Sequence, residues 1–205
     1  MQKYILVMLL VINCIVAEAQ IPRIQRNKTV PVAPAPAPSV YYFSNIKFTI
    51  HTGNDNKELN STFFVFVTEN EGIWGKGREL FGNKDRLSAI ELKPNSNTDI
   101  AMVQYPNTDQ NAYALSNLEA KGLRFRIMYS PGFLMDAWKI DAVTIVAEFK
   151  DQYGRLHPVS PYRTIRFNNM SGLLNNVKRD MIGVTDGFLN PKSLIITDLL
   201  YKEGI

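Results

Sequence analysis

Apolar and polar side chains alternate along much of the chain after residue 40. In residues 43–51 the apolar side chains of Ile46, Phe48 and Ile50 share one face, and polar side chains occupy the other. This two-residue period predicts a half-buried β-strand. Similar alternation, or a high content of aromatic and β-branched residues, marks further strand candidates at residues 62–68, 88–93, 100–104, 123–129, 137–150, 159–167 and 194–201.

Two segments depart from the strand pattern. Residues 69–83 contain four glycines and predict a long loop that carries Trp74. Residues 168–181 place Leu173, Leu174, Val177 and Met181 at helical spacing, which predicts a short amphipathic helix. Because many short strands are separated by turns, we expect an all-β fold, an antiparallel β-sandwich with a short C-terminal helix.

The first 39 residues have a different character. Residues 1–19 combine a positive charge at Lys3, an apolar run and a small-residue exit at Ala17-Glu18-Ala19, which predicts an export signal cleaved before Gln20. Residues 20–39 hold five of the eleven prolines, and their Pro-Ala alternation predicts an extended polyproline II linker. This linker either holds the domain away from a surface or is a disordered tail. A single domain is expected over residues 40–205.

Cysteine usage bears on the compartment. The only cysteine, Cys14, lies inside the predicted signal, so the mature chain would have none. Small secreted eukaryotic domains usually contain disulfides, so an exported domain without cysteine favours a bacterial cell envelope. Cys14 is also a candidate for lipid attachment, although Asn13 stands where such sites normally have a small residue. The expected location is periplasmic, outer-membrane-associated or extracellular.

Charge argues against nucleic acid as a partner, and hydropathy argues against a membrane-spanning segment. The net charge is +4 and the lysines and arginines are scattered, so nucleic acid is not expected as a partner. The apolar run of the signal is shorter than the roughly twenty residues that span a bilayer, and we expect no transmembrane segment. The sequence leaves the oligomeric state open.

Three stretches of sequence resemble one family. They are Ile46-Lys-Phe-Thr-Ile50 running into Thr52-Gly53-Asn54-Asp55, the strand opened by Ser61-Thr62, and residues 123–129 leading to the tryptophan strand that follows Asp136. Over residues 42–150 they resemble the PLAT domain, the lipoxygenase-homology β-sandwich. The resemblance implies a PLAT-like or jelly-roll-like sandwich without catalytic activity that binds lipid surfaces or protein partners.

The same resemblance bears on a metal. PLAT domains sometimes hold calcium in their loops, and Asp55 and Asp136 fall where the family has loop acids. Calcium takes six to eight oxygen ligands. Asn and Asp clusters are also ordinary turn residues, and turn chemistry is the favoured explanation of residues 52–56. No cofactor is expected, with calcium on Asp55 and Asp136 as the one alternative.

Catalytic signatures are weak. His51 and His157 are the only histidines, and neither has a second ligand at metal spacing. No glycine-flanked serine elbow occurs, and residues 72–77 lack the Ser or Thr that follows the lysine of a phosphate loop. Glu91, Asp99 and Asp141 would form a glycosidase pair only if the fold brought two of them together. We therefore expect no enzyme.

Apolar residues in turn-rich segments are the strongest candidates for binding. Trp74, Phe81, Phe133 and Leu134 either contact a partner or fold back over the ends of the sandwich. The expected function is a non-catalytic binding or structural subunit of the bacterial envelope that uses these side chains on an envelope protein complex or a membrane surface. A carbohydrate-binding module and a small extracytoplasmic hydrolase are the alternatives.

Overall fold

The computed structural model describes residues 38–198, apart from 74, 84–89, 107 and 170–171. The chain divides into two units, Met1–Pro38 and Ser39–Ile205, and the strands and helices described below belong to the second. The predicted signal peptide, and all of the predicted linker except its last two residues, lie outside the described residues.

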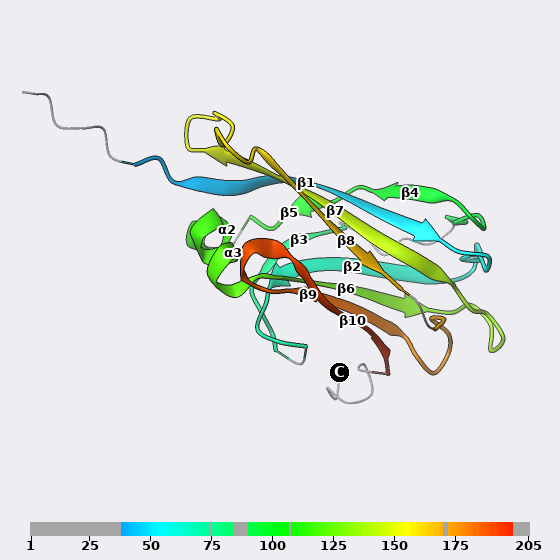
Figure 1. Cartoon of the computed structure of the whole chain (residues 1–205). Helices are drawn as coiled ribbons and strands as arrows, with labels where there is room; N and C mark the ends of the chain where they lie inside the picture. The colour runs from blue at the N-terminus through cyan, green and yellow to red at the C-terminus, as the bar shows by residue number, and fades with distance from the viewer. Residues whose placement is uncertain (1–37, 74, 84–89, 107, 170–171, 199–205) are drawn as a thin grey trace, which may run out of the picture. The chain divides into compact units, whose positions relative to one another are not determined.

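The described residues form two antiparallel sheets, which appear as two layers in Figure 1. The four-stranded sheet has the order β4-β1-β7-β8, and the six-stranded sheet has the order β10-β9-β6-β2-β3-β5. The fold is thus the all-β antiparallel sandwich that the alternation predicts. The strands are β1 Tyr41–Thr52, β2 Thr62–Glu69, β3 Glu79–Gly82, β4 Asn97–Ile100, β5 Val103–Gln104, β6 Leu123–Ser130, β7 Ile140–Asp151, β8 Tyr162–Asn168, β9 Asp180–Thr185 and β10 Pro191–Thr197.

The core lies between the two sheets and is rich in aromatic rings. Phe48 of β1 meets Phe125 of β6 edge to face with 5.7 Å between ring centroids, so the contact joins one sheet to the other. Phe125 also contacts Phe167 of β8 at 5.0 Å. A register shift between Phe43 and Asn45 in the β1–β7 pairing inserts one residue, which lets Phe43 and Ile46 both enter the core despite their odd spacing.

The helices do not lie where the sequence pattern places one. Residues 168–181 were expected to be helical, but β8 ends at Asn168, β9 begins at Asp180, and the described residues between them form a loop. Asn175 Oδ1 accepts the backbone N–H groups of Val177 and Lys178, a local turn that competes with helix formation. The α-helices in the described residues are α2 Gln110–Tyr113 and α3 Leu115–Lys121, and a short 3-10 helix, η1, spans Gly187–Leu189.

Strand registers bring three loops together at one end of the sandwich. The end of β1 pairs with the start of β7 at Thr52 and Ile140, and the start of β2 pairs with the end of β6 at Thr62 and Ser130. The end of β8 and the start of β9 lie beside the same strand ends. The loops of residues 53–61, 131–139 and 169–179 therefore gather here, and we call this the loop end.

Candidate functional site

Three consecutive apolar side chains project from the loop end into solvent. Phe133, Leu134 and Met135 are 66%, 81% and 95% exposed, and together they are called the tip. In the adjacent loop Leu59 is also exposed, and its neighbour Asn60 packs directly against the backbone of Gly132. A run of exposed apolar residues on a turn marks an interaction surface more often than scattered single ones do.

The base of the tip is rigidly held. Phe133 O accepts the N–H of Asp136 at 3.1 Å, and Asp136 Oδ2 accepts the N–H of Gly132 at 3.2 Å, so a closed turn carries the tip. Two residues further on, Trp138 and Leu174 exchange backbone hydrogen bonds of 2.8 and 3.0 Å, which ties this loop to residues 169–179. The tip thus stands on a fixed support, which lowers the entropy that docking would cost.

The support is anchored in the core by Trp138. Its indole is fully buried and packs against Phe63 at 5.1 Å and Tyr129 at 5.7 Å between ring centroids. Lys139 N donates to Asp55 O at 3.1 Å, and Gly53 N donates to Lys139 O at 2.7 Å, so residues 53–61 join the same framework. All three loops are connected by backbone hydrogen bonds next to one buried aromatic cluster.

A polar cluster lies at the base of the tip and includes both acids predicted as calcium ligands, the buried Asp136 and the half-buried Asp55. Burial raises the pKa of Tyr129, and the negative charges of Asp136 and Asp55 raise it further. Tyr129 Oη and Asp136 Oδ1 are buried, and Ser61 and Asp136 are the side-chain neighbours of the Tyr129 hydroxyl. The fold therefore brings Asp55 and Asp136 to the same hydroxyl from two loops.

A fixed cation belongs to this cluster. Lys57 is fully buried, and its Nζ donates to Glu58 O at 2.8 Å and to Ile90 O at 2.7 Å. Burial lowers the pKa of Lys57, while the charge of Asp136 opposes that shift. The carboxylates of Asp55 and Asp136, with the buried ammonium of Lys57 near Asp136, supply few of the oxygens that calcium needs. No group of three or more His, Cys, Asp or Glu side chains in the described residues could hold a metal ion, and calcium stays a prediction.

The residues predicted to bind a partner have different outcomes. Phe133 and Leu134 are exposed at the tip, whereas Trp74 lies outside the described residues. Phe81 was expected on a loop, but it belongs to β3, is 2% exposed and packs against Phe43 at 4.6 Å between centroids. It is a core residue, and its assignment to a binding surface was wrong. The sequence analysis missed Met135, although it continues the same apolar run.

Neither histidine lies at the loop tip. His157 Nδ1 accepts the N–H of Ser160 at 2.9 Å and so closes a turn. His51 lies on the outer face of the four-stranded sheet, with Nδ1 2.6 Å from Asn97 Oδ1 and Nε2 2.8 Å from Thr144 Oγ1. A hydroxyl, an imidazole and an orienting amide occur there in the order of a nucleophile and its base. However, β1 and β7 are central strands whose backbone N–H groups pair with neighbours, so they offer no backbone donor to an oxyanion. The side-chain donor beside the pair is Arg166, whose Nη1 lies 3.3 Å from Thr144 Oγ1 and 3.2 Å from His51 Nε2.

Comparisons of the chain with protein-family models, with curated proteins and with solved structures found no match in any of the three. The PLAT-like topology therefore remains a prediction from the sequence. Within the described residues, no helix is long and apolar enough to cross a membrane.

Proposed function

We propose that this protein is an exported, non-catalytic binding or structural subunit of the bacterial cell envelope. It docks through the tip, Phe133, Leu134 and Met135, onto a lipid surface or an envelope protein. The observation that carries the proposal is the exposure of three consecutive apolar side chains on a loop whose base is fixed by backbone hydrogen bonds to its neighbours.

The size of the tip supports reversible docking. Burial of an exposed Phe, Leu or Met side chain contributes roughly 1.5–3 kcal/mol, so the three together contribute about 5 kcal/mol or more before the cost of association. That cost is reduced because the turn is already closed by Asp136. The tip alone is thus suited to a transient contact, and a stable complex would need further surface.

The absence of catalysis is part of the proposal and is supported by the histidine geometry. The hydrogen bonds of His157 are those of a turn. The hydrogen-bonded pair His51 and Thr144 lies on a sheet face where the neighbouring backbone N–H groups already pair with adjacent strands. An ester-hydrolysis assay on the purified chain and on His51→Ala and His157→Ala tests this statement. Turnover that either substitution abolished would establish the hydrolase alternative instead.

Vesicle flotation tests the docking surface. The mature chain is compared with a Phe133→Ser, Leu134→Ser, Met135→Ser triple variant on zwitterionic and anionic vesicles, with and without calcium. The matched control is Val159→Ser with Phe188→Ser, because both residues are exposed apolar side chains far along the chain from the tip. We expect the triple variant to lose at least about a thousandfold in partitioning, as the contribution of about 5 kcal/mol requires, and the control to keep its affinity.

A pull-down of the tagged mature chain from its native envelope separates the two kinds of partner. A stable protein complex that forms with the parent and is lost with the triple variant assigns the tip to a protein. Flotation without such a complex assigns it to lipid. Equal behaviour of the triple variant and the parent in both experiments would overturn the proposal.

A further inference from the structure

Strand β10 forms one edge of the six-stranded sheet. Within the described residues it pairs only with β9, so alternate backbone N–H and C=O groups along its other side have no strand to pair with there. The register shift in the β10–β9 pairing lies between Pro191 and Ser193, and the pairing from Ser193 to Thr197 is regular. A regular edge of this kind can accept a further strand.

The other three edges of the two described sheets are protected in ways that β10 is not. Strand β5 has only two residues, and β4 has four, of which Asp99 is charged and exposed. Strand β8 is as long as β10 but carries Arg163 and Arg166. Short strands and charged side chains discourage pairing at an edge. In β10, by contrast, residues 194–196 are three consecutive apolar residues with high β-propensity.

The side chains of β10 are held by the domain on both faces of the strand. Leu194 and Ile196 pack against the core between the sheets, and Ile195 packs against the separate cluster of Ile182 and Val184. The strand is therefore fixed in extended form before any partner arrives, which lowers the entropy that pairing would cost.

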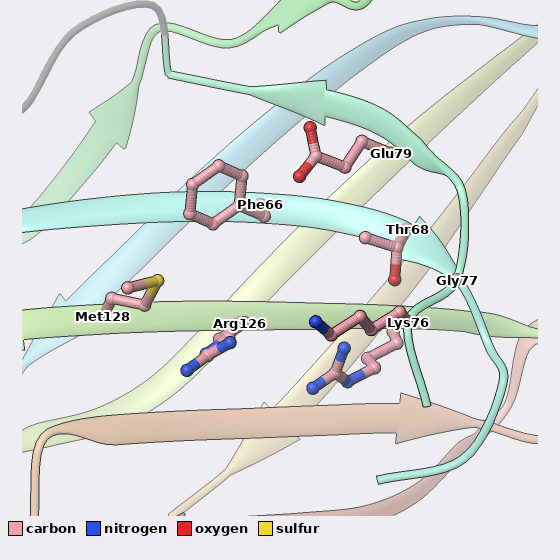
Figure 2. A pocket seen from close by; sticks show the side chains of 8 residues that line it. Phe66, Thr68, Lys76, Gly77, Glu79, Arg126 and Met128 are labelled. Carbon is pink, nitrogen blue, oxygen red and sulfur yellow. The ribbon is translucent and has the colours of Figure 1, made fainter. Parts of the chain in front are cut away.

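The outer face of the six-stranded sheet is no alternative place for a further strand. Phe64 and Phe66 of β2 stack there with 5.9 Å between ring centroids. Figure 2 shows Phe66 lying over β2, with Arg126 and Met128 on the neighbouring β6. Arg126 Nε donates to Asp180 Oδ1 at 2.7 Å, so this charge is paired within the domain. Strands β2 and β6 each pair with a neighbour on both sides, which leaves pairing to the edge at β10.

We propose that β10 pairs antiparallel with β10 of a second copy of this chain, with Ile195 of each copy on the twofold axis. In this register Leu194 of one copy lies opposite Ile196 of the other, and Ser193 lies opposite Thr197. Each edge is then covered by an identical edge, which is what a closed twofold dimer requires. The inference concerns a different surface from the tip and does not depend on the proposed function.

Charge complementarity favours a second copy as the partner and selects this register. Lys192 of one copy lies opposite Asp198 of the other at both ends of the paired segment, and opposite charges across two strands stabilise their pairing. Asp198 also accepts a hydrogen bond from Thr197 Oγ1 at 3.3 Å, and a carboxylate accepts several donors. An axis at Leu194 would place Lys192 opposite Ile196, and an axis at Ile196 would place Asp198 opposite Leu194.

Sedimentation velocity of the full mature chain at increasing concentration tests the proposal. One strand pair buries less than the roughly 1,600 Å² of a standard interface, so we expect a reversible dimer with a dissociation constant on the order of 100 μM. Lys192→Glu places two negative charges opposite each other and should raise this constant about tenfold, and Asp198→Lys should do the same with two positive charges. Lys93→Glu is the matched control at an exposed lysine before β4, and it should leave the constant unchanged.

A mixture of the two reversal variants tests the register directly. Lys192→Glu and Asp198→Lys chains each bring like charges together in their own dimers, whereas a mixed dimer has opposite charges at both ends. We therefore expect the mixture to associate about as tightly as the parent. Thermal melting of each variant checks that the fold is retained.

Three results would overturn the proposal. They are a monomer at every concentration, reversal variants that dimerise like the parent, and a mixture that associates no more tightly than its components. The tip triple variant should dimerise like the parent, which keeps this outcome independent of the docking experiment. Loss of the dimer in that variant would assign association to the tip and would also overturn the pairing through β10.

Discussion

At the scale of single residues, Glu69 is the clearest case of a charge that the fold itself holds. Its side chain is 1% exposed at the end of β2 and accepts hydrogen bonds from Arg78, Asn117 and Lys121. Burial alone would raise the pKa of Glu69, but these hydrogen bonds outweigh it and lower the pKa to about 2. The carboxylate therefore joins the loop after β2 to helix α3.

Replacement of this carboxylate should destabilise the protein in a pH-dependent way. The folded pKa of about 2 lies below the usual value of about 4.3, so the ionised group stabilises the fold above about pH 4 and loses this effect as the pH falls towards 2. Urea unfolding at pH 7 should show that Glu69→Gln lowers the free energy of unfolding by about 3 kcal/mol.

The difference in free energy of unfolding between the parent and Glu69→Gln should become smaller when urea unfolding is measured near pH 2.5. Glu71→Gln is the control, because Glu71 is exposed and pairs with Lys121 only at the surface. Its effect should stay within about 0.5 kcal/mol. A pH-independent difference for Glu69→Gln would show that the effect comes from packing and not from charge.

For single residues, the sequence predicts least reliably which apolar side chains are exposed and available for binding. Phe81 and Phe133 both lie in turn-rich sequence, yet Phe81 is buried and Phe133 is exposed. The difference arises because Phe81 lies on β3 and pairs with Val67 of β2, a strand that is separated from β3 by a loop. Local composition carries no signal for that pairing. For the tip, in contrast, the apolar pair Phe133-Leu134 after Pro131-Gly132 was a sufficient local signal, although Met135 was missed.

At the scale of elements, alternation located the long strands β1, β2, β6 and β7, but helical spacing misplaced the helix. Strand β3 lies in the predicted loop of residues 69–83, strand β9 was not predicted, and residues 90–93 of the candidate 88–93 belong to no named strand. The segment that became α2 and α3 does carry end signals, since Asp109 Oδ1 caps the start and Gly122, with a φ of 87°, ends α3. Ala114 breaks the run with extended backbone, which leaves each piece too short for a clear period. Residues 168–181 have the period, but turn-forming Asn175 takes the backbone N–H groups that a helix would need.

Gly183 of β9 offers a test of how tightly the core packs around the ring of Phe125. A Cβ on Gly183 would lie 2.1 Å from Cε1 of Phe125, the ring that contacts both Phe48 and Phe167. Gly183→Ala should lower the free energy of unfolding by about 1–3 kcal/mol, because the ring must move within a packed core. Chemical unfolding of Gly183→Ala, Phe125→Leu and the double variant forms the cycle that checks this cause.

The smaller Leu side chain should make room for the added methyl group. The double variant is therefore expected to be more stable than the sum of the two single effects predicts. Additive losses would mean that Gly183 is needed for its backbone and not for the space beside Phe125.

At the scale of the whole molecule, the sandwich places two different surfaces on one rigid body. The tip extends from the loop end, whereas the stacked rings of Phe64 and Phe66 lie on the outer face of the six-stranded sheet. Sequence alone indicated the first, because it is contiguous. It did not indicate the second, because the alternation along β2 does not show which face its neighbours leave uncovered, although apolar residues occur at both faces of β2 in the sequence.

The last prediction concerns the segment before the domain. Strand β1 begins at Tyr41 and the described core starts at Phe43, so removal of residues 20–38 should change the free energy of unfolding by less than about 0.5 kcal/mol. Vesicle binding through the tip should also persist. If the Pro-Ala sequence is a spacer, its 19 residues reach about 60 Å as polyproline II, and recovery of an envelope partner should fall when they are removed.

The replacement of the same residues distinguishes reach from sequence. A scrambled Pro-Ala segment of equal length should restore recovery of the partner, since it keeps the extended backbone. A Gly-Ser segment of equal length spans only about 25 Å on average and should restore it in part. Full recovery by the truncated chain would show that the segment is a tail without a role in docking. Recovery by the native sequence alone would show that a partner recognises its side chains, which a spacer does not require.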